Sequence, residues 1–389
     1  MILGADASRK EGISGSIVAA GAVVALVIAP LAGAVSDRWR APSGRRRTFL
    51  LVGMLGTCLG LGLLIPFGPS GNLLFYLIVF LNLQLWWNVA SGPYAGLIPD
   101  VVPEPDHGIA SAWIIILSTL GTIAGYVIMA ALYTHGHPAT VILVFIGINL
   151  VCLVLTLTKV PGSPPSLDHS PFYLVAFIRS FWIDPRDHGN FYWVLATRLF
   201  VNMGIWWIFT FLSYYLRSIG VENAPNRLST LLSVGLTLGI PACLIAPRLA
   251  THYGIIQVVQ VTSLIMGIAV FCYVPLAIYP SFALGVLVLV IFGASYGAYQ
   301  VADWTLALRV LPSRDTAGKD MGIWHICMVL PQILAPGISG WLISGIKMVS
   351  SERLAYITAF GIAAFWFILA AWLITRVRIP GTRMRRVTP

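Results

Sequence analysis

Two residues of opposite charge, Arg198 and Asp303, each lie inside a long apolar stretch of the sequence. Arg198 comes seven residues after the start of its stretch, and Asp303 comes nine residues before Pro312, which follows its own stretch. At about 1.5 Å per helical residue, each would lie roughly 10 Å from an end of its helix. We expect the two to pair, because an isolated charge inside a bilayer costs roughly 3 kcal/mol. Such a pair is either structural or part of a gate or a proton pathway.

Further polar side chains recur at helical spacing on these two stretches and on a third. Polar groups in hydrocarbon need a partner or water, so these stripes are expected to face a wet cavity or a neighbouring helix. The stripes consist of Gln84, Asn88 and Ser91, of Arg198, Asn202 and Trp206, and of Tyr296, Gln300 and Asp303.

Two tryptophan pairs, Trp86–Trp87 and Trp206–Trp207, lie in mid-stretch, away from the interfacial positions that tryptophan prefers. Flat aromatic faces beside amides suit the apolar faces and hydroxyl rims of a sugar, and helix packing or lipid contact is the alternative. His325, near the start of a later stretch, either joins a proton route or is a packing residue. If these stretches line a cavity for a solute, the candidate substrate-binding residues are Gln84, Trp87, Asn88, Asn202, Trp206, Tyr296 and Gln300, and the candidate coupling residues are Arg198, Asp303 and His325.

Composition places these residues in a membrane. Of the 389 residues, 58% are hydrophobic and 10% are charged, whereas soluble domains carry about 25% charged residues. Stretches of about 20 apolar residues can cross a bilayer as helices. The sequence therefore predicts an all-α polytopic membrane protein with eleven spans, near 13–35, 48–68, 73–99, 110–134, 140–158, 191–217, 228–250, 256–279, 282–310, 321–346 and 354–377.

The basic residues lie mainly in loops on one side of these spans. Seventeen of the 24 lysines and arginines fall on that side, so it is predicted to be cytoplasmic, with the carboxyl terminus inside and the amino terminus outside a cell (inner) membrane. Despite a net charge of +10, the charge forms no continuous face, which argues against nucleic-acid binding. The five cysteines lie on five different spans without metal or disulfide spacing, so we expect no metal and no cofactor.

The chain has two similar halves. Pro103 and Pro312 occupy matching positions 209 residues apart, and Gly44 and Gly254 are 210 apart. This repeat places the counterpart of span 191–217 upstream of Met1, so we expect that a first helix is missing, with a genuine eleven-helix protein as the alternative. The predicted parts are an N-terminal bundle of five spans (1–158), a cytoplasmic linker with an interfacial helix (159–190), a C-terminal bundle of six spans (191–377) and a basic tail (378–389).

The first basic loop and the third span carry the sequences LAGAVSDRWRAPSGRRRTF (31–49) and NVASGPYAGLIPDVV (88–102). The first resembles the signature of the major facilitator superfamily. Its five residues between Arg38 and Gly44 make it similar to the glycoside–pentoside–hexuronide:cation symporters and the sucrose symporters. The resemblance implies two helical bundles around a midplane cavity. It also implies that Asp37 latches the start of the helix near Met321, unless the motif only anchors topology. The motif residues assigned to gating are Gly33, Asp37, Arg38, Gly44, Arg45, Arg46, Arg47 and Asp100.

The chain departs from these families at the sites that bind their ions and sugars. Ala25 and Ala29 stand where the melibiose symporters carry aspartates, which removes a sodium site of that design. Gln84 and Ala95 align with a carboxylate and an arginine of the sucrose symporters, so their contacts do not transfer. Asp303 is then the intramembrane carboxylate left to carry protons.

We therefore expect a secondary transporter that moves a small polar solute, a sugar such as sucrose or maltose, by alternating access, with protons as a candidate coupling ion. Its expected partners are the lipid bilayer and this solute, and we expect a monomer. An exporter of drug-like or amphipathic solutes and a non-transporting or degenerate membrane protein are the alternatives. An enzyme is not expected, because no GxSxG, HExxH, Walker or GxGxxG pattern occurs in a suitable setting.

Overall fold

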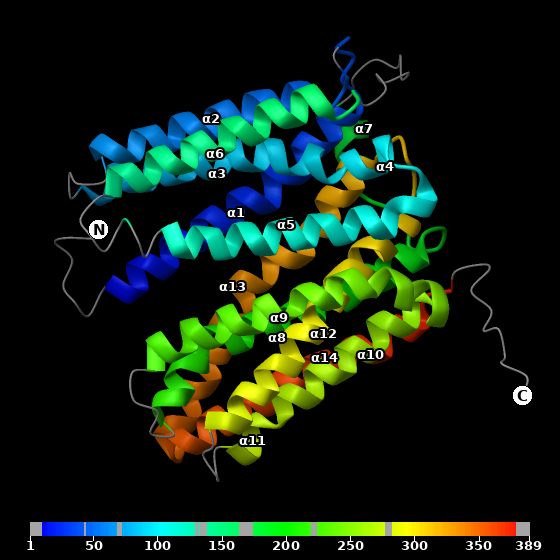
Figure 1. Ribbon diagram of the computed structural model, residues 1–389. Coiled ribbons are helices and arrows are strands. Elements are labelled where there is room, and N and C mark those ends of the chain that lie inside the picture. Colours follow the sequence, from blue (N-terminus) through cyan, green and yellow to red (C-terminus); the bar gives the residue numbers. More distant parts are fainter. Residues whose placement is uncertain are drawn as a thin grey trace, which may run out of the picture. The chain divides into compact units, whose positions relative to one another are not determined.

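The computed structural model describes residues 10–42, 44–67, 72–128, 132, 138–162, 174–218, 224–276 and 282–378, and within these ranges it is all-helical (Figure 1). Helices are the expected solution in hydrocarbon, because each satisfies its own backbone N–H and C=O groups. Among the described residues, ten helices have the length and composition of a membrane span. The predicted polytopic membrane fold is therefore confirmed, with ten spans found among the described residues where eleven were predicted. The long helices are α1 (Lys10–Asp37), α2 (Arg47–Phe67), α3 (Leu73–Ala95), α5 (His107–Ile128), α6 (Pro138–Lys159), α8 (Gly189–Ser218), α9 (Ala224–Tyr253), α10 (Ile255–Phe271), α12 (Phe282–Arg309), α13 (Ala317–Val349) and α14 (Glu352–Leu373).

Two predicted spans are interrupted where they were expected to be continuous. Span 73–99 ends as α3 and resumes after Gly96 as the short α4 (Leu97–Val101), because the Gly96 amide bonds back to Pro93 in a tighter turn. Span 256–279 ends as α10 and is followed by α11 (Tyr273–Leu276), where Pro275 has no N–H to donate to the preceding turn. A short helix, α7 (Leu174–Arg179), lies where the interfacial helix was predicted, and its place at a membrane interface stays a prediction. Residues 163–173 of the linker lie outside the described ranges.

The chain forms two compact units. Unit 1 comprises Met1–Glu104, Thr122–Ile183 and Leu311–Val329, so it includes the first part of α13. Within it, α3 packs against α1 and α2, and α2 packs against α6 (Figure 1). Small residues allow close approach of these helices, because Gly92 of α3 meets the Ala29 carbonyl of α1 and Gly53 of α2 meets the backbone of Ala90.

Unit 2 comprises Pro105–Gly121, Asp184–Val310 and Leu330–Pro389, so it includes the first part of α5. In it, α12 packs against α9 and α10, and α14 packs against α8 and α10. A buried apolar cluster joins α5, α9 and α12; its members are Ala112, Ile116, Cys243, Ala246, Ala298 and Val301. The boundaries 1–158 and 191–377 assign each helix to one bundle and stay a prediction, whereas the compact units divide α5 and α13.

The predicted repeat has a counterpart in backbone geometry. Gly44 and Gly254, which the sequence aligns, have φ angles of 103° and 92°, and they are the only glycines in the described part of the chain with positive φ. Each lies just before a helix, α2 or α10. The same turn chemistry therefore recurs in both halves, in a conformation that a side chain would strain.

Glycines also determine how closely α9 and α12 approach. Gly235 and Gly239 of α9 lie directly against Gly293 and Gly297 of α12, so that a Cβ on Gly239 would lie only 2.7 Å from the Gly293 carbonyl oxygen. The obstacle is backbone, which cannot rotate away as a side chain could. This contact holds the helix that carries Gln300 and Asp303.

We expect Gly293→Ala to lower the free energy of unfolding by about 1–3 kcal/mol, because the new methyl group collides with the backbone of Gly235. The matched control is Gly285→Ala on the same helix, where nothing lies within 4 Å of the added Cβ. That change should stabilise the protein by up to about 1 kcal/mol, since alanine is the better helix former. Thermal unfolding of the purified protein measures both, and equal effects would contradict the packing assigned to α9 and α12.

Candidate functional site

Charged residues of unit 1 meet where α1 ends and α2 begins. Asp37 is the last residue of α1, and Arg45 and Arg46 directly precede α2. The short helix α4 supplies Asp100, and α13 begins nearby in the same unit. We call Asp37, Arg45, Arg46 and Asp100 the charge cluster.

The carboxylate of Asp37 binds the start of α13. It accepts hydrogen bonds from the backbone amides of Gly318 and Lys319, at N···O distances of 3.0 and 2.8 Å. These amides lie in a first helical turn, where N–H groups lack partners within the helix and the dipole favours a negative charge. Gly33 permits the approach, because a side chain there would collide with the Gly318 carbonyl. The contact lies beside Met321, and its role in gating stays a prediction.

Arg46 is completely buried and joins both carboxylates of the charge cluster. Its Nη2 lies 2.6 Å from Asp37 Oδ1, its Nε lies 2.9 Å from Asp100 Oδ2, and its Nη1 donates to the Ser36 hydroxyl. Gly96 leaves room for the guanidinium, since a Cβ there would lie 2.9 Å from Nη2. The break between α3 and α4 at Gly96 therefore makes space for a buried charge.

Arg45 shares Asp100 with Arg46. Its Nη2 and Nε lie 2.6 and 3.1 Å from the two oxygens of Asp100, and it also donates to the carbonyls of Arg314 and Asp315. Burial alone would lower the pKa of Arg45, but the hydrogen bonds and charge of Asp100 outweigh it and hold that pKa above its ordinary value. Two guanidinium groups and two carboxylates leave the charge cluster without net charge, which makes its burial possible.

The remaining motif residues surround this cluster. Arg38 is half-buried, and Arg47 donates to the Val160 carbonyl at 2.5 Å. Lys319 donates from Nζ to the carbonyl of Ser180 at 2.7 Å, which ties the linker to the start of α13.

In unit 2, Arg198 of α8 and Asp303 of α12 form a buried ion pair between Nη1 and Oδ2. Their exposed fractions are 3% and 0%. Tyr299, one turn before Asp303, is also fully buried and lies beside the carboxylate. Because the surrounding helical amides are bonded within α12, the carboxylate depends on side-chain donors. We call Arg198 and Asp303 the buried pair, and Tyr299 is its tyrosine.

The neighbouring polar residues of unit 2 differ in burial. Asn202 is buried and donates to the Arg198 carbonyl of its own helix at 2.9 Å. Gln300 and Tyr296 are half-buried and lie within hydrogen-bonding reach of each other. These two side chains are therefore the more available to a solute.

The stripe on α3 divides between packing and exposure. Asn88 is buried and donates to the Gln84 carbonyl at 2.8 Å, and the Gln84 amide lies beside Gly21 of α1. Trp86 packs against Gly56 of α2, whereas Trp87 is 49% exposed.

The second tryptophan pair divides in the same way. Trp207 is 3% exposed and lies near Trp366 of α14, with ring centroids 6.2 Å apart, while Trp206 is half-buried. His325 is half-buried in the unit 1 part of α13, and its place on a proton route stays a prediction.

Several polar residues of these sites were not among the sequence candidates. Spacing offered a signal for Tyr299, which lies four residues before Asp303. The same spacing links the buried Asp320 to Thr316, but it offered no signal for Ser36 or Lys319, whose contacts join separate segments. Across the described ranges, no group of three or more His, Cys, Asp or Glu side chains could hold a metal ion.

Comparison with known sequences identifies relatives of this chain. A family model described as the Major Facilitator Superfamily matches residues 3–318. Solute carrier family 45 member 3 of Mus musculus is 30% identical over 163 residues, which cover 39% of this chain and 29% of the mouse protein. The Homo sapiens protein of the same name is 32% identical over 108 residues, covering 25% and 20%. The chain therefore matches less than a third of the length of these curated relatives.

Solved structures show the same fold at low sequence identity. The fucose:proton symporter FucP of E. coli has a TM-score of 0.70 at 14% identity, covering 95% of this chain and 91% of its own. The proton:xylose symporter XylE has a TM-score of 0.71 at 14% identity, covering 96% and 88%. The human organic anion transporter MFSD10 has a TM-score of 0.74 at 16% identity, covering 96% and 86%.

We expect Asp37→Ala to release the start of α13. The amides of Gly318 and Lys319 would lose their acceptor, and hydrogen bonds to charged groups contribute about 1.5–3 kcal/mol each. Hydrogen exchange in a peptide covering 314–322 should accelerate at least about tenfold. Asp106→Ala, at an exposed carboxylate, is the control and should leave exchange unchanged. Unaltered protection in the Asp37 variant would contradict the contact.

For the buried pair, we expect Asp303→Asn and Arg198→Gln each to lower the free energy of unfolding by about 3–5 kcal/mol, because each leaves the other charge buried without its partner. The double variant should be less destabilised than the sum of the two. Thermal unfolding of the four proteins gives the coupling free energy. Strictly additive losses would show that the two side chains do not interact.

Proposed function

The chain belongs to the major facilitator superfamily, and on this premise we propose that it is a secondary transporter that moves a small polar solute, a mono- or disaccharide, by alternating access coupled to protons. The single observation that carries the proposal is the buried pair and its tyrosine in α8 and α12. Retaining two charges at a fully buried position is costly, and intramembrane ionisable groups commonly serve ion pathways.

Proton coupling is supported by the position of Asp303. Within the described helices, it is the one acidic residue that lies more than a turn from a helix end. A proton that binds Asp303 removes its charge, and Arg198 then needs another acceptor. A solute hydroxyl or water in an open cavity supplies that acceptor, so proton binding and solute binding favour the same rearrangement.

A sugar is supported by the groups beside the pair. Gln300 and Tyr296 are half-buried and offer amide and hydroxyl groups one turn from Asp303 and Tyr299. Trp206 adds a partly exposed aromatic face from α8. FucP and XylE, which have the same fold, are symporters of fucose and of xylose with protons.

Gating is assigned to the charge cluster. The two hydrogen bonds that Asp37 accepts from backbone amides contribute about 3–6 kcal/mol together. Moving a two-state equilibrium from 1:99 to 99:1 takes about 5.5 kcal/mol, so the contact is strong enough to bias one state without locking it. Asp37 would leave the start of α13 when this end of the transporter opens.

The test uses the purified chain in liposomes with labelled sucrose, maltose, fucose and xylose. With an inward proton gradient (acidic outside) absent or imposed, we expect accumulation of at least one sugar only when the gradient is imposed. Asp303→Asn should lose accumulation at least about tenfold yet still exchange labelled for unlabelled sugar, because asparagine cannot carry the proton. Thr158→Val, at an exposed position of α6, is the control and should accumulate normally.

Retained exchange also shows that the Asp303 variant is folded. Accumulation that survives in this variant would remove Asp303 from coupling. A chain that accumulates no sugar but extrudes an amphipathic dye would favour the exporter, and a chain that moves neither would favour a non-transporting protein.

A further inference from the structure

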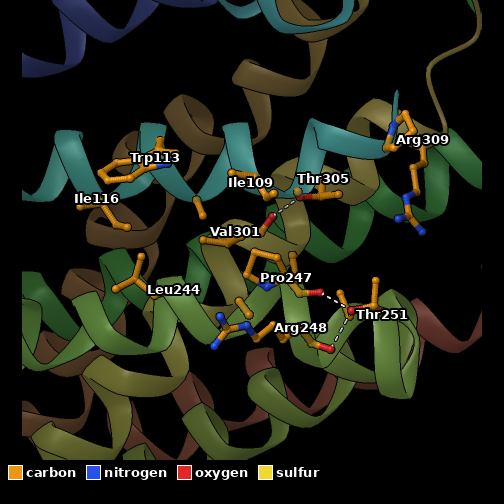
Figure 2. Close-up of a pocket in the computed structure, with 16 residues that line it drawn as sticks. Ile109, Trp113, Ile116, Leu244, Pro247, Arg248, Thr251, Val301, Thr305 and Arg309 are labelled. Carbon is orange, nitrogen blue, oxygen red and sulfur yellow. Dashed lines mark hydrogen bonds between the residues drawn. The ribbon is translucent and has the colours of Figure 1, made fainter. Parts of the chain in front are cut away.

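A groove opens in unit 2 between the first part of α5 and the last turns of α9 and α12, at the helix ends that the basic residues predict to be cytoplasmic. Its volume is about 340 Å³. Figure 2 shows Trp113, Ile116 and Leu244 toward one end of the groove, and Thr251 and Arg309 toward the other. The groove is therefore apolar around Trp113, Ile116 and Leu244, and its two arginines, Arg248 and Arg309, come from α9 and α12.

The apolar part exposes side chains to the groove. Ile109 and Trp113 of α5 and Leu244 of α9 are each more than half exposed, at 55%, 54% and 53%. Beneath them lies the cluster that joins the three helices, with Ala112 and Val301 at its surface. An apolar chain of a ligand bound in this groove would cover Ile109, Trp113 and Leu244 and would pack on the buried cluster beneath them.

The basic part consists of Arg248 of α9 and Arg309 of α12, both exposed. None of the sixteen lining residues is acidic. Neither arginine forms an ion pair with another residue in the described ranges. Two cations without a carboxylate beside an apolar groove complement a ligand with an anionic head and an apolar tail.

We propose that this groove binds one anionic phospholipid, with its headgroup on Arg248 and Arg309 and an acyl chain along Ile109, Trp113 and Leu244. Basic pockets between membrane helices attract anionic headgroups, and arginine binds phosphate oxygens in a bidentate manner. The bound lipid touches α5, α9 and α12 together and stabilises their packing. This inference does not depend on the transported solute.

The test follows the thermal unfolding of the full chain in detergent during titration with phosphatidylglycerol, cardiolipin or phosphatidylcholine, with native mass spectrometry to count bound lipids. We expect the two anionic lipids to raise Tm and phosphatidylcholine to have little effect. Arg248→Gln with Arg309→Gln should weaken anionic-lipid binding about thirtyfold, at about fivefold per charge. The charge-matched control, Arg179→Gln with Arg186→Gln, removes two exposed arginines outside the groove and should bind normally.

Two further measurements distinguish the binding of a lipid from the binding of a free anion. Inorganic phosphate should not reproduce the rise in Tm. Gly108→Leu should fill the groove, since a Cβ there meets only Pro247 at 3.6 Å, and should weaken lipid binding while both arginines remain. The variant Arg248→Lys with Arg309→Lys keeps the charge and should retain most of the binding.

The proposal is overturned if phosphatidylcholine binds as well as phosphatidylglycerol, or if the Arg179 and Arg186 control loses as much binding. It is also overturned if phosphate stabilises the protein as much as the lipid does and Gly108→Leu changes nothing, because the groove would then hold only an anion. Unfolding in phosphatidylcholine alone shows whether each variant is folded before titration.

Discussion

A charged side chain that is buried away from water needs an opposite charge beside it, and the arrangement of the polar side chains in this protein follows from that constraint. The three arginines that are buried in the described part of the chain, Arg45, Arg46 and Arg198, each lie against a carboxylate. Their partners, Asp100, Asp37 and Asp303, belong to other helices. The pair of Arg198 and Asp303 joins two helices, and Arg45 and Arg46 join the loop before α2 to α4 and α1. These elements can separate only if their charges are compensated elsewhere.

The two charged sites satisfy this constraint by different means. At the end of α1, Asp37 draws on the free amides of a helix start as well as on Arg46, so its charge is shared among several donors. Inside unit 2 the helical amides around Asp303 are bonded within α12, and its carboxylate depends on the side chain of Arg198, with Tyr299 beside it. The first arrangement can lose one bond at modest cost. The second changes as a whole, which suits a site that responds to a single proton.

The sequence could predict the features that hydropathy reveals within single segments, and one contact between two of them. Hydropathy located the long helices, and equal depth on two of them predicted that Arg198 and Asp303 would meet. The binding of Asp37 to the start of α13 followed only from the family resemblance, because the two are about 280 residues apart. The hydrogen bonds from Arg45 to the carbonyls of Arg314 and Asp315 could not be predicted from the sequence, since every residue has a backbone carbonyl. Nor could spacing decide that Trp86 packs inward and Trp87 outward, because adjacent helical positions differ only in what lies opposite them.

The close approach of α9 and α12 has a consequence at their ends. Glycines let these helices touch along their length, which brings Arg248 and Arg309 to the same groove. Like charges beside one groove repel each other, and near an apolar wall water screens that repulsion less than in bulk. The buried arginines of the chain resolve such a conflict with a carboxylate, but the groove lining contains none. An anion from the bilayer would supply the missing charge, so residues that are predicted to fix topology would also hold a lipid.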